Sequence, residues 1–269
     1  MSKDEDRWKN LDREYRILTG IQPRKLGPTP IFFDRDGAVL CYEFVEGAPL
    51  EPLQVKNHLA AIARKAREIH DFDVRNFSIP FNQYPNFYGF MEEIERYSIM
   101  RLAEAQKILD KKYLNMLQQI LMRARDRLHK NKKYFKGTDL RFSHKDFKSW
   151  NLVLQESGEI MPIDWNFGNI CDPAFDLCQI SRSSDLNIAE VDELIRYYGQ
   201  EDTNLRARID TYMDICRVPC IIWHVDRLKN PLYNISEKRK EEYRRYSGRY
   251  LIEMIKEGNA PQGALRLIS

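Results

Sequence analysis

The stretch of residues 142–165, FSHKDFKSWNLVLQESGEIMPIDW, constrains the fold most strongly. It contains two short apolar runs, at 152–154 and 160–163, separated by Glu156, Ser157 and Gly158. Short apolar runs on either side of such a turn predict a β-hairpin. A hairpin places the residue before its first strand beside the residue after its second strand. Polar side chains at these two positions should therefore meet at one end of the hairpin.

Four polar residues flank this predicted hairpin: His144, Asp146 and Asn151 before it, and Asp164 after it. Phosphoryl transfer needs one carboxylate to accept the proton of an attacking hydroxyl. It also needs carboxylate and amide oxygens to hold magnesium against the nucleotide phosphates. The pattern H-x-D-x-x-x-x-N, followed by an apolar strand and a second Asp, is typical of kinase catalytic loops. Each residue alone is more often structural, but the combination indicates a phosphotransferase site.

These motifs resemble the branch of the protein-kinase-like fold that includes aminoglycoside phosphotransferases and choline kinases. Those families carry I-D-W or I-D-Y where protein kinases carry D-F-G, and this chain has Ile163, Asp164 and Trp165. Residues 171–177, CDPAFDL, match the following G-D-P-x-x-D-L motif except at the first position. The resemblance implies an α+β, protein-kinase-like fold. It would have a truncated small N-terminal lobe in residues 1–47 and a mainly helical C-terminal lobe in residues 48–269.

The resemblance also implies roles for the clustered residues. Asp146 would orient an acceptor hydroxyl and accept its proton, while Asn151 and Asp164 would hold Mg²⁺ against the phosphates of ATP. His144 is expected to buttress the loop. Lys148 could neutralise charge on the transferred phosphoryl group, or it could be a surface lysine. The expected activity is transfer of the γ-phosphate to a hydroxyl of a small molecule, which the sequence does not identify.

Residues 42–47, YEFVEG, resemble the hinge between the lobes, where backbone groups of Glu43 and Val45 would bind the adenine ring. Glu14 lies in a predicted helix over 4–19. It is the candidate for the glutamate that pairs with a nucleotide-binding lysine in this fold, the alternative being a solvated helix carboxylate.

The sequence departs from the family in front of this helix. The thirteen residues that precede Glu14 contain no glycine, so a Gly-rich phosphate loop and its lysine are not found there. Three interpretations therefore remain open. The chain is an active small-molecule kinase, a catalytically silent kinase-like binding module, or a protein or lipopolysaccharide-type kinase, which Lys148 mildly favours.

The remaining pattern predicts further elements. His70, near the end of one predicted helix, is expected to be a packed structural residue. Residues 74–91 are rich in aromatic side chains, and this segment is expected to be a packed loop or a lid beside the acceptor pocket. The expected strands are 31–33 and 38–45, and the expected helices are 54–72, 92–131, 187–199, 202–227 and 236–257.

Bulk properties limit the partners and the compartment. The formal net charge of +3 is mild and does not argue for nucleic acid. No apolar run is long enough to cross a membrane, and the charged N-terminus does not read as a secretory signal. Five cysteines without such a signal suggest reduced thiols, so we expect a cytoplasmic protein. The oligomeric state is left open.

Overall fold

The computed structural model describes most of the chain. The described parts are residues 3–75, 111–199, 202–229, 234–256 and 262–267, with positions 96, 98–100, 102, 103, 106 and 260. The chain forms two compact units, one of residues 1–87 and 137–209, the other of residues 88–136 and 210–269. The expected lobe boundary at residue 47 remains a prediction. Among the described residues, no helix is long and apolar enough to span a bilayer.

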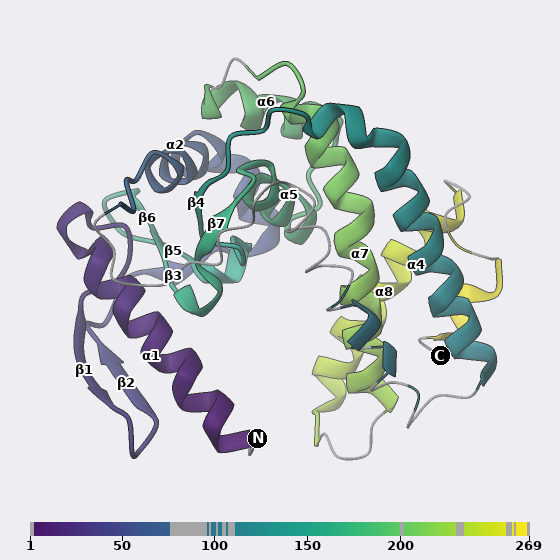
Figure 1. Cartoon of the computed structure of the whole chain (residues 1–269), viewed down its shortest axis with the longest axis horizontal. Coiled ribbons are helices and arrows are strands. Elements are labelled where there is room, and N and C mark those ends of the chain that lie inside the picture. Colours follow the sequence, from purple (N-terminus) through teal and green to yellow (C-terminus); the bar gives the residue numbers. More distant parts are fainter. Residues whose placement is uncertain are drawn as a thin grey trace. The chain divides into compact units, whose positions relative to one another are not determined.

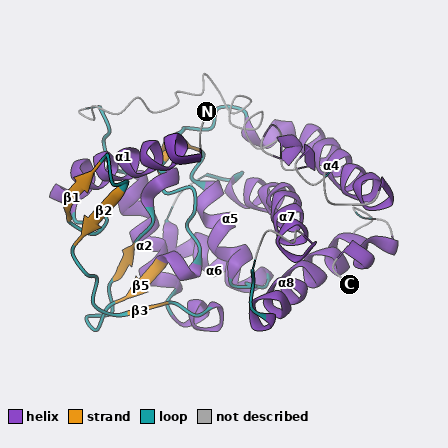
Figure 2. Ribbon diagram, turned by 90° about the horizontal axis from the view of Figure 1, so that it is seen from below, coloured by secondary structure: helices purple, strands orange, loops and turns teal. Residues whose placement is uncertain are grey.

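The first unit begins with helix α1, Lys3–Ile21, which lies alongside a two-stranded antiparallel ribbon (Figures 1 and 2). The ribbon strands are β1, Pro30–Asp34, and β2, Val39–Tyr42. The rings of Tyr15 on α1 and Phe33 on β1 stack with their centroids 5.7 Å apart. The predicted helix and hairpin are therefore confirmed, although the second strand is shorter than expected.

The helix expected at 54–72 starts later than its apolar pattern suggests. A 3-10 helix, η2 (Pro52–Asn57), comes first, and α2, Leu59–His70, follows. The break falls at His58, whose φ of −125° is far from the helical value. Helix α2 packs against α6, Ile188–Tyr198, where the Asn187 side chain accepts the Glu190 N–H and so caps the N-terminus.

The hairpin predicted within residues 142–165 is present. Strands β5, Leu152–Leu154, and β6, Ile160–Pro162, pair antiparallel, with Gly158 at a φ of 82° in the turn between them. A short strand that was not predicted, β3 (Ala48–Pro49), pairs with β5 and completes a three-stranded sheet. A second two-stranded sheet joins β4, Arg141–Ser143, to β7, Asn169–Cys171.

Helix α5, Ala174–Ser183, is the core of the first unit, because every one of its residues is buried. Asp172 caps it by accepting the Ala174 N–H at 3.0 Å. The Arg208 guanidinium pairs with the same carboxylate at 2.8 Å. Asp172 thus has a structural role, because it holds both the start of α5 and Arg208.

The second unit is helical in its described residues. Helix α4 is Lys111–Asn131, followed by the 3-10 helix η3, Lys132–Phe135. Helix α7 is Leu205–Lys229, of which residues 210–229 belong to this unit, and α8 is Glu237–Lys256, followed by the 3-10 helix η6, Gln262–Leu267. The His224 ring bonds Ser247 Oγ at 2.7 Å, which ties α7 to α8. The expected segment at 74–91 lies almost wholly outside the described residues.

Candidate active site

Asp146 and Asn151 are bonded side chain to side chain on the loop that leads into β5. Asn151 Nδ2 donates to Asp146 Oδ2 at 2.8 Å and to the Asp146 carbonyl at 2.9 Å. The turn that positions Asn151 is the 3-10 helix η4, Ser149–Asn151, closed by the bond from the Asn151 N–H to the Lys148 carbonyl. Among the described residues nothing donates to Asn151 Oδ1, so this oxygen is available to a ligand.

Asp164 reaches the same place from the far end of the hairpin. The Ile163 N–H donates to the Asn151 carbonyl at 2.9 Å, and Asp164 itself has a left-handed backbone with φ 63°. Burial raises the pKa of the Asp164 carboxyl, and the nearby Asp146 charge raises it further. The structure therefore brings Asp146, Asn151 and Asp164 together. Oxygen donors with two mutually repelling carboxylates fit a hard divalent cation such as Mg²⁺.

Lys148 lies at this cluster and not on an open surface. Its ammonium pairs with Asp146 Oδ1, and both side chains are largely buried. The same ammonium lies over the Trp150 ring, 5.6 Å from its centroid. A cation is thus already placed beside the carboxylate that is the candidate base.

His144 ties the loop to the I-D-W segment. Its Nε2 bonds the Ile163 carbonyl at 3.0 Å, and its Nδ1 accepts the Asp146 N–H at 3.3 Å. The imidazole also packs against the Trp165 ring, with centroids 4.5 Å apart. Burial lowers the pKa of His144, so the neutral Nε2–H tautomer matches both bonds. These contacts are those of a loop buttress.

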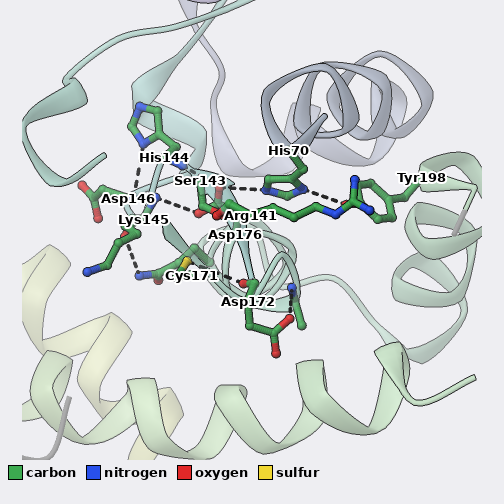
Figure 3. A network of polar contacts seen from close by, with 12 residues as sticks. His70, Arg141, Ser143, His144, Lys145, Asp146, Cys171, Asp172, Asp176 and Tyr198 are labelled. Atoms are coloured by element: carbon green, nitrogen blue, oxygen red, sulfur yellow. Dashed lines mark hydrogen bonds and ion pairs between the residues drawn. The ribbon is translucent and has the colours of Figure 1, made fainter. Parts of the chain in front are cut away.

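A buried network continues from the loop to α2 and α6 (Figure 3). The Asp176 carboxylate accepts the backbone N–H groups of His144 and Lys145, each at 2.8 Å. It also bonds His70 Nε2 at 3.1 Å, and His70 Nδ1 bonds the Tyr198 hydroxyl at 2.8 Å. All of these side chains except Lys145 are buried. His70 is the packed structural residue that the sequence indicates, but its two partners were not predicted.

Residues 42–47, which the resemblance assigns to the hinge, are joined to the hairpin by close backbone approach at Gly47. Gly47 has a φ of 130°, and a Cβ there would lie 2.3 Å from the Leu154 carbonyl oxygen. The Glu43 N–H is already used, since it donates to the Thr29 carbonyl at 2.8 Å. Within the described chain, no backbone hydrogen bond engages the Glu43 carbonyl or the Val45 N–H.

Glu14 faces the I-D-W segment. It is 7% exposed, and its Oε1 accepts the Trp165 N–H at 3.0 Å. On the preceding residue, Arg13 Nη2 donates to the Gly168 carbonyl at 2.7 Å. Burial raises the pKa of Glu14 to about 7, the Trp165 bond opposes this, and the Asp164 charge adds to it. Glu14 is therefore not a solvated carboxylate, although no lysine of the described chain bonds it.

Comparison with known proteins identifies the family to which the chain belongs. The family model described as choline/ethanolamine kinase matches residues 2–206. The chain belongs to the choline/ethanolamine kinase family. The resemblance and the phosphotransferase class inferred from the motifs are thereby confirmed: the family is one of kinases that act on a hydroxyl-bearing small molecule. No curated protein sequence matches the chain significantly.

Solved structures confirm the protein-kinase-like fold that this family shares. A choline/ethanolamine kinase family protein from Mesorhizobium loti matches with a TM-score of 0.68 at 17% identity, over 96% of this chain and 82% of that one. A choline kinase from Streptococcus pneumoniae matches with a TM-score of 0.68 at 19% identity, over 95% and 83%. An aminoglycoside phosphotransferase with bound ADP matches with a TM-score of 0.57 at 16% identity, over 90% and 81%.

Proposed function

We propose that the protein is an ATP-dependent phosphotransferase that moves the γ-phosphate to a hydroxyl of a small molecule. The observation that carries this proposal is the convergence of Asp146, Asn151 and Asp164 at one end of the β5–β6 hairpin. This is the arrangement that a family kinase needs for one base and one magnesium site.

Asp146 is the base in this proposal. Its carboxylate is held from two sides, by Asn151 Nδ2 on Oδ2 and by the Lys148 ammonium on Oδ1. An acceptor hydroxyl that binds at Asp146 is oriented by the carboxylate and passes its proton to a carboxylate oxygen as it attacks. Lys148 offsets the negative charge that gathers around the transferred phosphoryl group.

Asn151 Oδ1 and the Asp164 carboxylate are the ligands that would hold Mg²⁺. When bound, the ion would neutralise phosphate charge and orient the γ-phosphate. The left-handed backbone of Asp164 and the bond from Ile163 to Asn151 fix the two ligands relative to each other. The two proposed ligands would therefore be in position before a nucleotide binds.

The nucleotide base is assigned to the hinge. The Glu43 carbonyl would accept from the adenine amino group, and the Val45 N–H would donate to a ring nitrogen. The printed description of the ADP-bound aminoglycoside phosphotransferase supports a nucleotide site in this fold. None of the five cysteines, all of which the structure describes, forms a disulfide, which is consistent with the cytoplasmic location that we propose.

A thermal-shift and turnover experiment tests the proposal. ATP with Mg²⁺ at a hundredfold excess over Kd should stabilise the protein by about 2.7 kcal/mol. A panel of small alcohols that includes choline and ethanolamine should reveal an acceptor by ADP release. Asp146→Ala should retain the ATP-induced shift and lose turnover, whereas the exposed control Asp139→Ala should retain both. No shift at millimolar Mg·ATP, or full turnover by Asp146→Ala, contradicts the proposal.

A second candidate function is a catalytically silent, nucleotide-binding module. It is favoured by Glu14, which is bonded to the Trp165 N–H and has no lysine partner in the described residues. The thermal-shift and turnover experiment distinguishes the silent module from the active kinase. A silent module shows the Mg·ATP shift but releases no ADP with any acceptor, and Asp146→Ala then changes nothing measurable in turnover.

A further inference from the structure

Trp150 is an exposed tryptophan in the middle of the catalytic loop. Its neighbours Ser149 and Asn151 are buried, yet Trp150 is 49% exposed. Burial of a large aromatic ring is favourable, so half-exposure means that the core does not hold this side chain. The contact that the structure gives to its ring is the ammonium of Lys148.

The Lys148 ammonium therefore has two partners. Its ammonium pairs with Asp146 Oδ1 and lies 5.6 Å from the centroid of the Trp150 ring. This distance is within the range of a cation–π interaction. The backbone helps to hold this pairing, because the Lys148 carbonyl accepts the Asn151 N–H at 2.9 Å and closes the turn that carries Trp150.

The pair with Asp146 creates a conflict for the proposed reaction. Oδ1 of Asp146 pairs with the Lys148 ammonium and Oδ2 accepts from Asn151 Nδ2, so an acceptor hydroxyl that binds at Oδ1 competes with Lys148 for that oxygen. A displaced lysine on a flexible side chain would move into solvent unless another group holds it. Trp150 is placed to be that group, because its ring does not compete with the hydroxyl for Asp146.

We propose that Trp150 is a positioning residue that keeps the Lys148 ammonium beside the transferred phosphoryl group while the acceptor hydroxyl occupies Asp146. This role rests on the proposed phosphotransferase function. In this role Trp150 acts on the reaction only through Lys148. No bond to Trp150 forms or breaks during the reaction.

The test compares Trp150→Phe, which keeps an aromatic face, with Trp150→Leu, which does not. The reaction followed is slow hydrolysis of Mg·ATP with water as the acceptor, because it needs no identified substrate. Trp150→Leu should lower kcat three- to fivefold, about 0.6–1 kcal/mol at 1.36 kcal/mol per tenfold, with little change in KM for ATP. Trp150→Phe should retain most of the rate.

Measuring Trp150→Leu in a Lys148→Met background shows whether Trp150 acts through Lys148 or through the structure of the loop in general. If Trp150 acts through Lys148, Trp150→Leu should cause no further loss of kcat in that background. Equal rates for the wild type and Trp150→Leu overturn the inference, and so does an undiminished loss in the Lys148→Met background. Absence of turnover in a wild type that binds Mg·ATP overturns the proposed function instead.

A measurement without turnover tests the contact itself. The indole Nε1–H resonance of Trp150 can be identified by its absence from the NMR spectrum of Trp150→Phe. Removal of the cation in Lys148→Met should shift this resonance and leave those of the other tryptophans in place. An unchanged Trp150 resonance contradicts the contact and with it the proposed positioning role.

Discussion

Oδ1 of Asp176 accepts a hydrogen bond of 2.8 Å from the backbone N–H of Lys145. Lys145 is the residue directly before Asp146, the candidate base. Lys145 has a φ of 63°, a left-handed conformation that costs a non-glycine residue about 1 kcal/mol or more. The Asp176 carboxylate offsets that cost by binding two successive N–H groups. The geometry of the catalytic loop therefore depends on a buried helix that itself makes no contact with phosphate in the proposed reaction.

Asp176→Asn should destabilise the protein by about 3 kcal/mol. The amide would direct an NH₂ group at a backbone N–H or at His70, and it would lose the charge that strengthens each bond. Urea denaturation measures this change. Asp139→Asn is the matched control, because Asp139 is exposed and its pair with Arg141 should contribute less than about 1 kcal/mol. Equal stability of the two variants contradicts the bracing role of Asp176.

Tyr198→Phe should cost about 1–2 kcal/mol. The change keeps the ring but removes the hydroxyl that bonds His70 Nδ1, which leaves a buried nitrogen without its partner. The neighbouring Tyr197 is exposed, so Tyr197→Phe should change the free energy of unfolding by less than about 0.5 kcal/mol. If both variants unfold at the same urea concentration as the wild type, the hydroxyl contributes nothing to the network.

The sequence predicts the cluster of Asp146, Asn151 and Asp164 better than it predicts the buried network that holds their loop in place. Gly158 and the two apolar runs specify a local hairpin, and a hairpin necessarily brings Asn151 and Asp164 together. No comparable local signal joins His70 to Tyr198, which are 128 positions apart. The pairing of β4 with β7 also escapes prediction, because three-residue strands are too short to show a periodic pattern.

Two local patterns were interpreted incompletely for physical reasons. The apolar spacing from residue 54 suits a helix, but Pro52 and the bond between Glu51 and Gln54 favour a 3-10 turn before α2. The exposure of Trp150 has no sequence signal, since a tryptophan is usually buried in the core. Its exposure is visible only once Ser149 and Asn151 are seen to face inward.

Gly47→Ala should destabilise the hinge and weaken nucleotide binding. A methyl group at a φ of 130° would be strained, and it would also lie 2.3 Å from the Leu154 carbonyl oxygen. The backbone of β3 or β5 must move to relieve this clash, so we expect a loss of more than about 2 kcal/mol. This movement should also displace the backbone groups of Glu43 and Val45 that are proposed to bind adenine. Isothermal titration should therefore show weaker binding of ADP.

Gly158→Ala is the control for Gly47→Ala. Gly158 also has a positive φ, 82°, but a Cβ there meets nothing within 4 Å. It should therefore show only the conformational cost of about 1 kcal/mol, and ADP should bind normally. If both variants lose similar amounts of stability and ADP affinity, glycine is needed at position 47 because of its positive φ and not because of the close approach to Leu154.

Glu14 should make the stability of the protein depend on pH between about 4.5 and 7. Its folded pKa of about 7 lies above its ordinary value of 4.5, chiefly because the side chain is buried. The protonated form therefore favours the folded state, and this contribution is complete below pH 4.5. It is lost as the pH rises through 7, when a buried carboxylate forms near Asp164. At 1.36 kcal/mol per pKa unit, the upper bound is about 3 kcal/mol.

Glu14→Gln should remove this dependence. Glutamine keeps an oxygen that accepts the Trp165 N–H, but it cannot ionise. The variant and the wild type should therefore have similar stability at pH 5, whereas the variant should be more stable at pH 8, by about 1–3 kcal/mol. Urea denaturation at the two pH values measures the difference, with the exposed Glu156→Gln as control. A difference of the opposite sign at pH 8 would mean that a cation accompanies the Glu14 carboxylate in the folded protein.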